Sequence, residues 1–262
     1  MLVIGERINA SRKTILQAIQ ERNIQFIQEE ATKQVEAGAK MLDVNAGVRI
    51  QQEVDDIEWL VKTVQEKVDI PLCIDSPNPK AIESGLKLHK GKALVNSITL
   101  QKDRLEGILP LVKKYNSLLV ALTMSATGMP ETANERFGIC KDIIEAVKKE
   151  GIPVESLYID PLVQPISTNI KNCLITLDTI RTIKNAFPVK IIIGLSNISF
   201  GLPNRRLINR TFLTMALDNG LDAALIDPLD KDMMSTLRAC EALLGQDEYC
   251  LNYLAAFREN KL

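Results

Sequence analysis

The sequence predicts a fold of the α/β class, a single (β/α)8 TIM barrel, because three features recur along the chain. Short apolar runs of the kind found in buried parallel strands occur eight times. Enough chain for an amphipathic helix separates each run from the next. Each run ends in a polar residue that can reach a ligand. The runs are Leu2–Glu6, Met41–Asn45, Leu72–Asp75, Ala93–Asn96, Leu118–Thr123, Leu157–Asp160, Ile191–Asn197 and Ala223–Asp227.

Helices are predicted between the runs from apolar spacing and from capping residues. The first connection should hold two helices, separated near Asn23. After the third run, Asn78 followed by Pro79 combines an N-cap residue with a proline at the first helical position. The two helices of the first connection are predicted at 13–21 and 25–37. Later helices are predicted at 52–68, 103–115, 133–150, 173–186, 207–219 and 231–245.

Composition narrows the class of protein. A length of 262 residues suits one barrel, so we expect residues 1–262 to form one domain. The net charge of −1 indicates no broad basic field for nucleic acid or an anionic membrane. The five cysteines are scattered without metal-ligand spacing, which favours reduced thiols in the cytoplasm. We find no basic, apolar leader pattern and no apolar stretch long enough to span a bilayer.

Histidine is the scarcest chemical group, since only His89 is present. It lies just before Gly91, in a pattern typical of a helix end, and we expect it to act there as a cation near the helix C-terminus. Catalysis by a histidine general base, a serine–histidine triad or a histidine-rich zinc site is therefore disfavoured.

Two of the connections that follow strands are longer than a minimal barrel requires. They are Thr123–Pro130, after the fifth run, and Ser196–Arg206, after the seventh. Loops at this end of a barrel often carry function.

Polar residues at four strand ends should converge at the barrel mouth. Asp75, Asn96, Asp160 and Asn197 end the third, fourth, sixth and seventh runs. Their carboxylates accept hydrogen bonds, and their carboxamides both donate and accept. This mixture suits the aminopyrimidinone edge of a pterin, which presents an amino group, a ring NH, a ring nitrogen and a carbonyl in one plane. Such a pocket needs no metal.

Other interpretations remain open at this point. Asp75 could be a helix cap, Asp160 could simply end a strand before Pro161, and Asp43 could brace the barrel. Together with Glu6, these three carboxylates could instead bind Mg²⁺, which prefers oxygen ligands. A Schiff-base aldolase is disfavoured, because no run ends in lysine.

Five segments resemble the pterin-binding methyltransferase family. The similarity is strongest to the methyltetrahydrofolate:corrinoid protein methyltransferases and extends to the folate module of cobalamin-dependent methionine synthase. It covers residues 2 to about 249. The segments are Gly194–Arg205, Ile4–Asn9, Asp43–Asn45, Cys73–Ser76 and Tyr158–Leu162.

The resemblance implies roles for particular residues. Asp75, Asn96 and Asp160 match the residues that hydrogen-bond the pterin. Asn197 matches the asparagine that approaches N5 of the folate and is the expected catalytic residue.

The remaining matches lie around this core. Ser196 and Arg205 match pocket positions near the pterin or its tail, and we include Glu6 with them as substrate-binding. Phe200 stands where the acetogen enzyme has an amide, and there the sequence is closer to methionine synthase.

The resemblance also implies the reaction. The expected enzyme transfers the N5-methyl group between 5-methyltetrahydrofolate and the cobalt of a separate corrinoid protein, in acetyl-CoA-pathway or anaerobic demethylase one-carbon metabolism. Tetrahydrofolate is then a substrate, cobalamin arrives on the partner, no cofactor is held tightly, and the chain forms a homodimer. The alternatives are a dihydropteroate synthase-like enzyme and a non-catalytic folate-binding or corrinoid-docking barrel.

Overall fold

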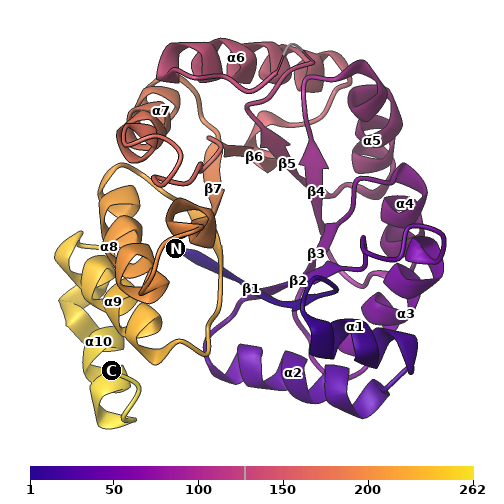
Figure 1. The fold of residues 1–262 in the computed structure, drawn as a ribbon, viewed down its shortest axis with the longest axis horizontal. Coiled ribbons are helices and arrows are strands. Elements are labelled where there is room, and N and C mark those ends of the chain that lie inside the picture. Colours follow the sequence, from indigo (N-terminus) through magenta and orange to yellow (C-terminus); the bar gives the residue numbers. More distant parts are fainter. Residues whose placement is uncertain (127) are drawn as a thin grey trace.

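A computed structural model describes residues 1–126 and 128–262. Thr127, part of the loop predicted after the fifth strand, lies outside the described residues. Eight parallel strands form a closed barrel in the order β1 to β8, and helices surround it (Figure 1). The prediction of a (β/α)8 barrel is confirmed.

The eight strands follow the eight apolar runs closely. They are β1 Leu2–Asn9, β2 Met41–Asn45, β3 Leu72–Asp75, β4 Leu94–Ile98, β5 Leu118–Leu122, β6 Leu157–Asp160, β7 Lys190–Gly194 and β8 Ala223–Ile226.

The α-helices also lie where they were predicted, with one addition at the C-terminal end. They are α1 Lys13–Gln20, α2 Ile24–Glu36, α3 Glu53–Gln65, α4 Pro79–Leu88, α5 Lys102–Tyr115, α6 Ala133–Lys149, α7 Asn172–Ala186, α8 Arg205–Asp218, α9 Lys231–Leu243 and α10 Leu251–Arg258. Short 3-10 helices cover Val154–Ser156 (η1), Leu195–Ser199 (η2) and Glu248–Cys250 (η3).

Local capping explains where several helices begin. The Asn78 side chain accepts the Lys80 N–H, and Pro79 occupies the first turn of α4. Thr132 and Glu135 form a reciprocal capping box at the start of α6. These contacts satisfy backbone N–H groups that have no partner inside the helix, so each helix starts at a defined residue after its loop.

The barrel interior is divided into an apolar layer and a polar mouth. Because side chains alternate along a strand, every second residue points to the barrel axis. The apolar interior layer consists of Ile4, Met41, Cys73, Leu94, Val120, Tyr158, Ile192 and Ala223. Further along the strands, the same alternation places polar residues at inward positions. The apolar layer beneath them forms a rigid floor for the site.

The structure differs from the prediction in several places. Strand β4 continues past Asn96 to Ile98, and β7 ends at Gly194, so that Asn197 lies in η2 and does not end a strand. Strand β1 continues past Glu6 to Asn9, with an irregular register between Gly5 and Ile8. Helix α10, which lies outside α9 at the edge of the molecule (Figure 1), was not predicted. A third long connection, 161–171, follows β6. In the described part of the chain, no helix is long and apolar enough to cross a membrane.

The predicted cationic role of His89 is wrong. Its Nε2 accepts a hydrogen bond from the Leu72 N–H at 2.9 Å, which requires a nitrogen without a proton. Burial lowers the pKa of this imidazole. His89 therefore acts as a neutral acceptor at the start of β3, at the end of the barrel opposite the mouth.

Candidate active site

Three neighbouring strands bring the first group of mouth residues together. Asn45 pairs in register with Asp75, and Asp75 pairs with Asn96. The Asn45 Nδ2 donates to Asp75 Oδ2 at 2.8 Å. One carboxylate thus lies between two carboxamides, as the sequence predicted for Asp75 and Asn96. Asn45 was recognised as a strand end and not as a site residue, although its pairing with Asp75 makes it one.

Asp75 carries a carboxyl group that burial makes hard to ionise. Burial raises its pKa and the neighbouring Glu53 carboxylate adds to this, while the Asn45 hydrogen bond and the Arg104 guanidinium act in the opposite direction. Arg104 itself donates to the backbone carbonyls of Pro77 and Ser97. A ligand that donated N–H groups to Asp75 would therefore stabilise the ionised carboxylate.

Asp160, at the end of β6, is held by a tight turn. Its Oδ1 accepts the Leu162 N–H at 2.8 Å, and Leu162 has a positive φ of 62°. The buried Arg136 of α6 donates to the carbonyls of Pro161 and Leu162 and so fixes this turn. Burial raises the pKa of Asp160 to about 6, although the Leu162 hydrogen bond and the Arg136 charge lower it. Asp160 stands apart from the Asp75 group across the mouth.

Glu6 and Ser196 line a small cavity between the ends of β1, β7 and β8. Its volume is about 100 Å³, and Asp227 and Asn209 also line it. Burial raises the pKa of Glu6 to about 7, partly opposed by Arg12, whose Nη2 is 3.7 Å from Glu6 Oε1. Glu6 is therefore partly protonated near neutral pH. Asp227 was predicted as a strand end but not as part of the site.

Asn197 is an exposed residue of η2, the largely buried turn that follows β7. A Cβ on Gly194 would lie 3.2 Å from Asn197 Nδ2, so the glycine leaves the space that this amide occupies beside the last inward position of β7. The Asn197 carbonyl accepts the Phe200 N–H, which closes the turn. The catalytic candidate is thus positioned by the backbone at the mouth.

Arg205 holds the same turn. Its Nη2 donates to the Ser196 carbonyl at 2.6 Å and its Nε to Ser199 Oγ at 3.0 Å. Its guanidinium also lies over the exposed ring of Phe200, 5.8 Å from the ring centroid. In this arrangement Arg205 supports the loop that carries Ser196 and Asn197.

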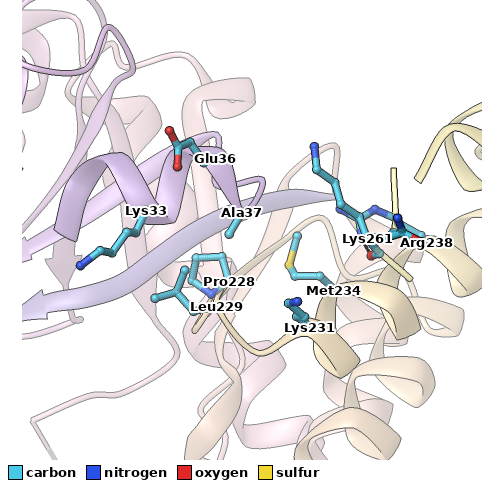
Figure 2. Close-up of a pocket in the computed structure, with 10 residues that line it drawn as sticks. Lys33, Glu36, Ala37, Pro228, Leu229, Lys231, Met234, Arg238 and Lys261 are labelled. Atoms are coloured by element: carbon cyan, nitrogen blue, oxygen red, sulfur yellow. Dashed lines mark hydrogen bonds between the residues drawn. The ribbon is translucent and has the colours of Figure 1, made fainter. Parts of the chain in front are cut away.

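Two further features bear on other uses of the molecule. Among the described residues, no group of three or more His, Cys, Asp or Glu side chains is arranged to hold a metal ion. Figure 2 shows a second hollow, of about 340 Å³, on the outer side of the barrel. It is lined by residues of α2, by Ala37, which follows that helix, and by α9 residues such as Met234. None of the mouth residues lines it.

The barrel and its mouth define the class of protein. Carboxylates and carboxamides at the C-terminal ends of parallel strands are the arrangement of a (β/α)8 barrel enzyme. A family described as "Pterin binding enzyme" matches residues 5–227. The chain belongs to this family of pterin-binding enzymes.

Curated relatives agree with this assignment. The chain is 38% identical over 265 residues to a methylcorrinoid:tetrahydrofolate methyltransferase of Eubacterium limosum, covering 100% of this chain and 98% of the relative. It is also 29% identical over 240 residues to methionine synthase of Mycobacterium tuberculosis. That match covers 86% of this chain but only 20% of the longer enzyme.

Solved structures with the same fold include two dihydropteroate synthases. The enzyme of Xanthomonas albilineans in complex with 7,8-dihydropteroate gives a TM-score of 0.72 at 17% identity, covering 94% of each chain. The enzyme of Yersinia pestis gives 0.71 at 17% identity, covering 93% of each chain. At this identity the likeness establishes the fold alone.

Proposed function

We propose that this chain transfers the methyl group between N5 of 5-methyltetrahydrofolate and the cobalt of a separate corrinoid protein. The observation that carries the proposal is the similarity over the whole chain to the Eubacterium limosum methyltransferase. The geometry of the mouth supports it, because Asp75 and Asp160 end their strands and Asn197 lies in the turn after β7. Asn96 lies within β4 and pairs in register with Asp75.

The pterin-binding part of the proposal follows from hydrogen-bond chemistry. Asp75 would accept hydrogen bonds from the pterin amino group and from the adjacent ring NH. These bonds would stabilise the ionised form of Asp75, which burial destabilises. Asn96 would pair with the neighbouring edge atoms, and Asp160 would accept from the other side of the mouth. Glu6, Ser196 and Arg205 would border the pterin or its tail near η2.

Asn197 would assist the chemical step. When the methyl group leaves N5, its bond to nitrogen breaks, the electron pair stays on N5, and N5 gains a proton to give tetrahydrofolate. Co(I) supplies the pair that forms the new cobalt–carbon bond and becomes methyl-Co(III). A hydrogen bond from Asn197 that strengthens as charge develops on N5 lowers the barrier. The reverse reaction uses the same contacts.

Exposed apolar side chains support a protein as the second substrate. Ile50, Ile170 and Phe200 are 79%, 88% and 64% exposed, and they lie on the loops after β2, β6 and β7. These loops surround the mouth. A corrinoid protein that docks over the mouth would cover these side chains.

The remaining parts of the proposal rest on the chain length, the scattered cysteines and the family resemblance. Residues 1–262 would form one domain, two copies would form a homodimer, the enzyme would act in the cytoplasm, and it would hold no cofactor tightly.

The test compares two reactions of the purified chain. We expect methyl-Co(III) and tetrahydrofolate to form from 5-methyltetrahydrofolate and cob(I)alamin, measured by absorbance and chromatography. We expect no dihydropteroate from a pterin pyrophosphate and p-aminobenzoate. Dihydropteroate formation without methyl transfer would replace the proposal with the synthase alternative. Folate binding without either reaction, also when corrinoid proteins are supplied, would favour a non-catalytic barrel.

A further inference from the structure

One arginine lies entirely inside the protein. Arg136 of α6 is 0% exposed and is the largest of the fully buried side chains. It occupies a core position, since Cys140 and Ile143 follow it on the buried face of the same helix. Its hydrogen-bond partners among the described residues are all uncharged. A buried charge with no opposite charge in contact lowers stability, so its presence at a core position calls for another reason.

The hydrogen bonds of Arg136 are directed mainly to the loop that follows β6. Its Nη1 donates to the Pro161 carbonyl at 2.8 Å and to the Leu162 carbonyl at 2.9 Å, with a longer contact of 3.5 Å to Thr176 Oγ1. Its Nε and Nη2 are buried and have no hydrogen-bond partner among the described residues. Unpaired buried donors are rare in native proteins, so hydrogen bonding alone does not account for an arginine at this place.

The turn that Arg136 holds also fixes the side chain of Asp160. The Leu162 N–H donates to Asp160 Oδ1 at 2.8 Å, and this bond requires the left-handed conformation of Leu162, whose φ is 62°. A leucine adopts this conformation at a cost and keeps it only where its surroundings fix it. The two carbonyl hydrogen bonds from Arg136 supply such a constraint. A continuous chain of hydrogen bonds therefore leads from the guanidinium through the turn to the carboxylate.

This arrangement leaves one oxygen of Asp160 available to a ligand. The Leu162 N–H binds Oδ1, and no hydrogen bond within the described part of the chain occupies Oδ2. Because the guanidinium bonds to the backbone, it does not compete with the ligand for the carboxylate. Its charge still acts over a longer range. Burial raises the pKa of Asp160, whereas the Leu162 hydrogen bond and the Arg136 charge lower it.

We propose that Arg136 is a positioning residue of the substrate site, which fixes the turn after β6 and holds the Asp160 carboxylate as an acceptor for the ligand. It touches neither the ligand nor the reacting atoms and acts through Asp160. The inference rests on the proposed function, because the ligand is taken to be the pterin of 5-methyltetrahydrofolate.

A double-mutant cycle separates positioning from packing. Arg136→Gln keeps a neutral donor for the loop carbonyls but removes the charge, so we expect it to bind 5-methyltetrahydrofolate at least about tenfold more weakly than the wild type. Asp160→Asn keeps an oxygen that can accept the Leu162 N–H but is not a carboxylate. In the Asp160→Asn background, Arg136→Gln should weaken binding by less than about threefold, because Arg136 acts through the carboxylate. A role in packing alone would give the same factor in both backgrounds.

Two further variants serve as controls. Arg136→Lys keeps the positive charge, so it should bind the folate more tightly than Arg136→Gln does. Lys184→Gln removes a cation that pairs with Asp222 at the opposite end of the barrel, at 2.9 Å, and should bind as the wild type does. Isothermal titration gives the dissociation constants, and thermal unfolding identifies any variant whose loss of binding comes from misfolding.

A spectroscopic measurement needs no change at Arg136 and covers the case in which Arg136→Gln does not fold. Infrared difference spectra of wild type minus Asp160→Asn, both with 5-methyltetrahydrofolate bound, should show the stretching bands of an ionised carboxylate. The band of a protonated acid in the complex would overturn the inference.

Two binding results would also overturn it: a folded Arg136→Gln variant that binds like the wild type, or an equal loss of binding in both backgrounds. A wild type that binds no 5-methyltetrahydrofolate would refute the proposed function and the inference with it. The failure of the inference alone is recognised by normal binding in the wild type.

Discussion

The two ends of the barrel treat charged and polar groups differently. At the end where the strands begin, ion pairs and hydrogen bonds hold several charged groups. Asp222 accepts from Lys184 Nζ at 2.9 Å and from the Ile191 N–H at 2.7 Å, and the Met1 ammonium pairs with Glu241 at 2.6 Å. At the mouth, burial raises the pKa values of the carboxyl groups of Glu6 and Asp160 to about 7 and about 6.

This difference separates stability from function. The pairs at the strand starts join segments that are distant in the sequence, and they need no ligand. The mouth residues carry a cost of burial that a hydrogen-bonding ligand can offset, which is typical of active sites. Substitutions at the mouth should therefore change binding and rate, whereas substitutions at the other end should change stability.

The largest effect is expected for Asn197→Ala. Loss of a hydrogen bond that strengthens in the transition state should lower the rate of methyl transfer by about 10²–10³. The dissociation constant for 5-methyltetrahydrofolate should change by less than about threefold, because the pterin contacts remain. Single-turnover kinetics and equilibrium binding measure the two quantities. A variant with equal, small changes in both would contradict the role given to Asn197.

Asp75→Ala should mainly weaken binding. The lost charge-assisted hydrogen bonds correspond to a dissociation constant about 10–100-fold higher. The unfolding temperature should stay the same or rise, because a buried carboxyl group is removed. Isothermal titration and thermal unfolding test this pair of effects, and Asp160→Ala should likewise weaken binding. Lower stability with unchanged folate binding would show that Asp75 has a structural role, like the residues at the strand starts.

Asp222→Ala should show the opposite pattern. It removes one ion pair and the acceptor of the Ile191 N–H, so the free energy of unfolding should fall by about 1–2 kcal/mol. Binding of 5-methyltetrahydrofolate should be unaffected. Urea unfolding measures the first quantity. Weaker folate binding in a variant that remains folded would show that the two ends are not independent.

The last expected effect concerns pH. Because the pKa of Glu6 is about 7 in the folded chain and about 4.5 in the unfolded chain, the folded state retains a proton between these values that the unfolded state has released. The free energy of unfolding should therefore fall as pH rises through this window, and then level off. Glu6→Gln should reduce this fall by about 2 kcal/mol, measured by urea unfolding at about pH 5 and about pH 7.5. An identical pH dependence in both proteins would contradict the raised pKa.

Much of the barrel could be predicted because its signals are local. Apolar runs that end in polar residues identified all eight strands, and caps such as Asn78 identified helix starts. Helix α10 was missed, since Ala256 is its only buried residue and its apolar pattern faces no core. The extension of β1 to Asn9 depends on pairing with β2 across an irregular register, which the sequence does not show.

The sequence indicated candidate site residues but not the contacts between them. Alternation and strand ends indicated Asp75, Asn96 and Asp160. The bond from Asn45 to Asp75 and the placement of Arg136 under the Asp160 turn depend on contacts between distant segments. The role of His89 was mistaken for the same reason, because its partner Leu72 lies 17 residues away in the chain.

The most direct test of this account is a single-turnover absorbance measurement with the purified chain, 5-methyltetrahydrofolate and cob(I)alamin. We expect methyl-Co(III) to form at a rate that depends on the chain, to fall about 10²–10³-fold in Asn197→Ala and to be unchanged in Asp222→Ala. Formation at the same rate in wild type and Asn197→Ala, or no formation with cob(I)alamin and with every corrinoid protein supplied despite folate binding, would contradict the claim that the mouth of this barrel is a methyl-transfer site.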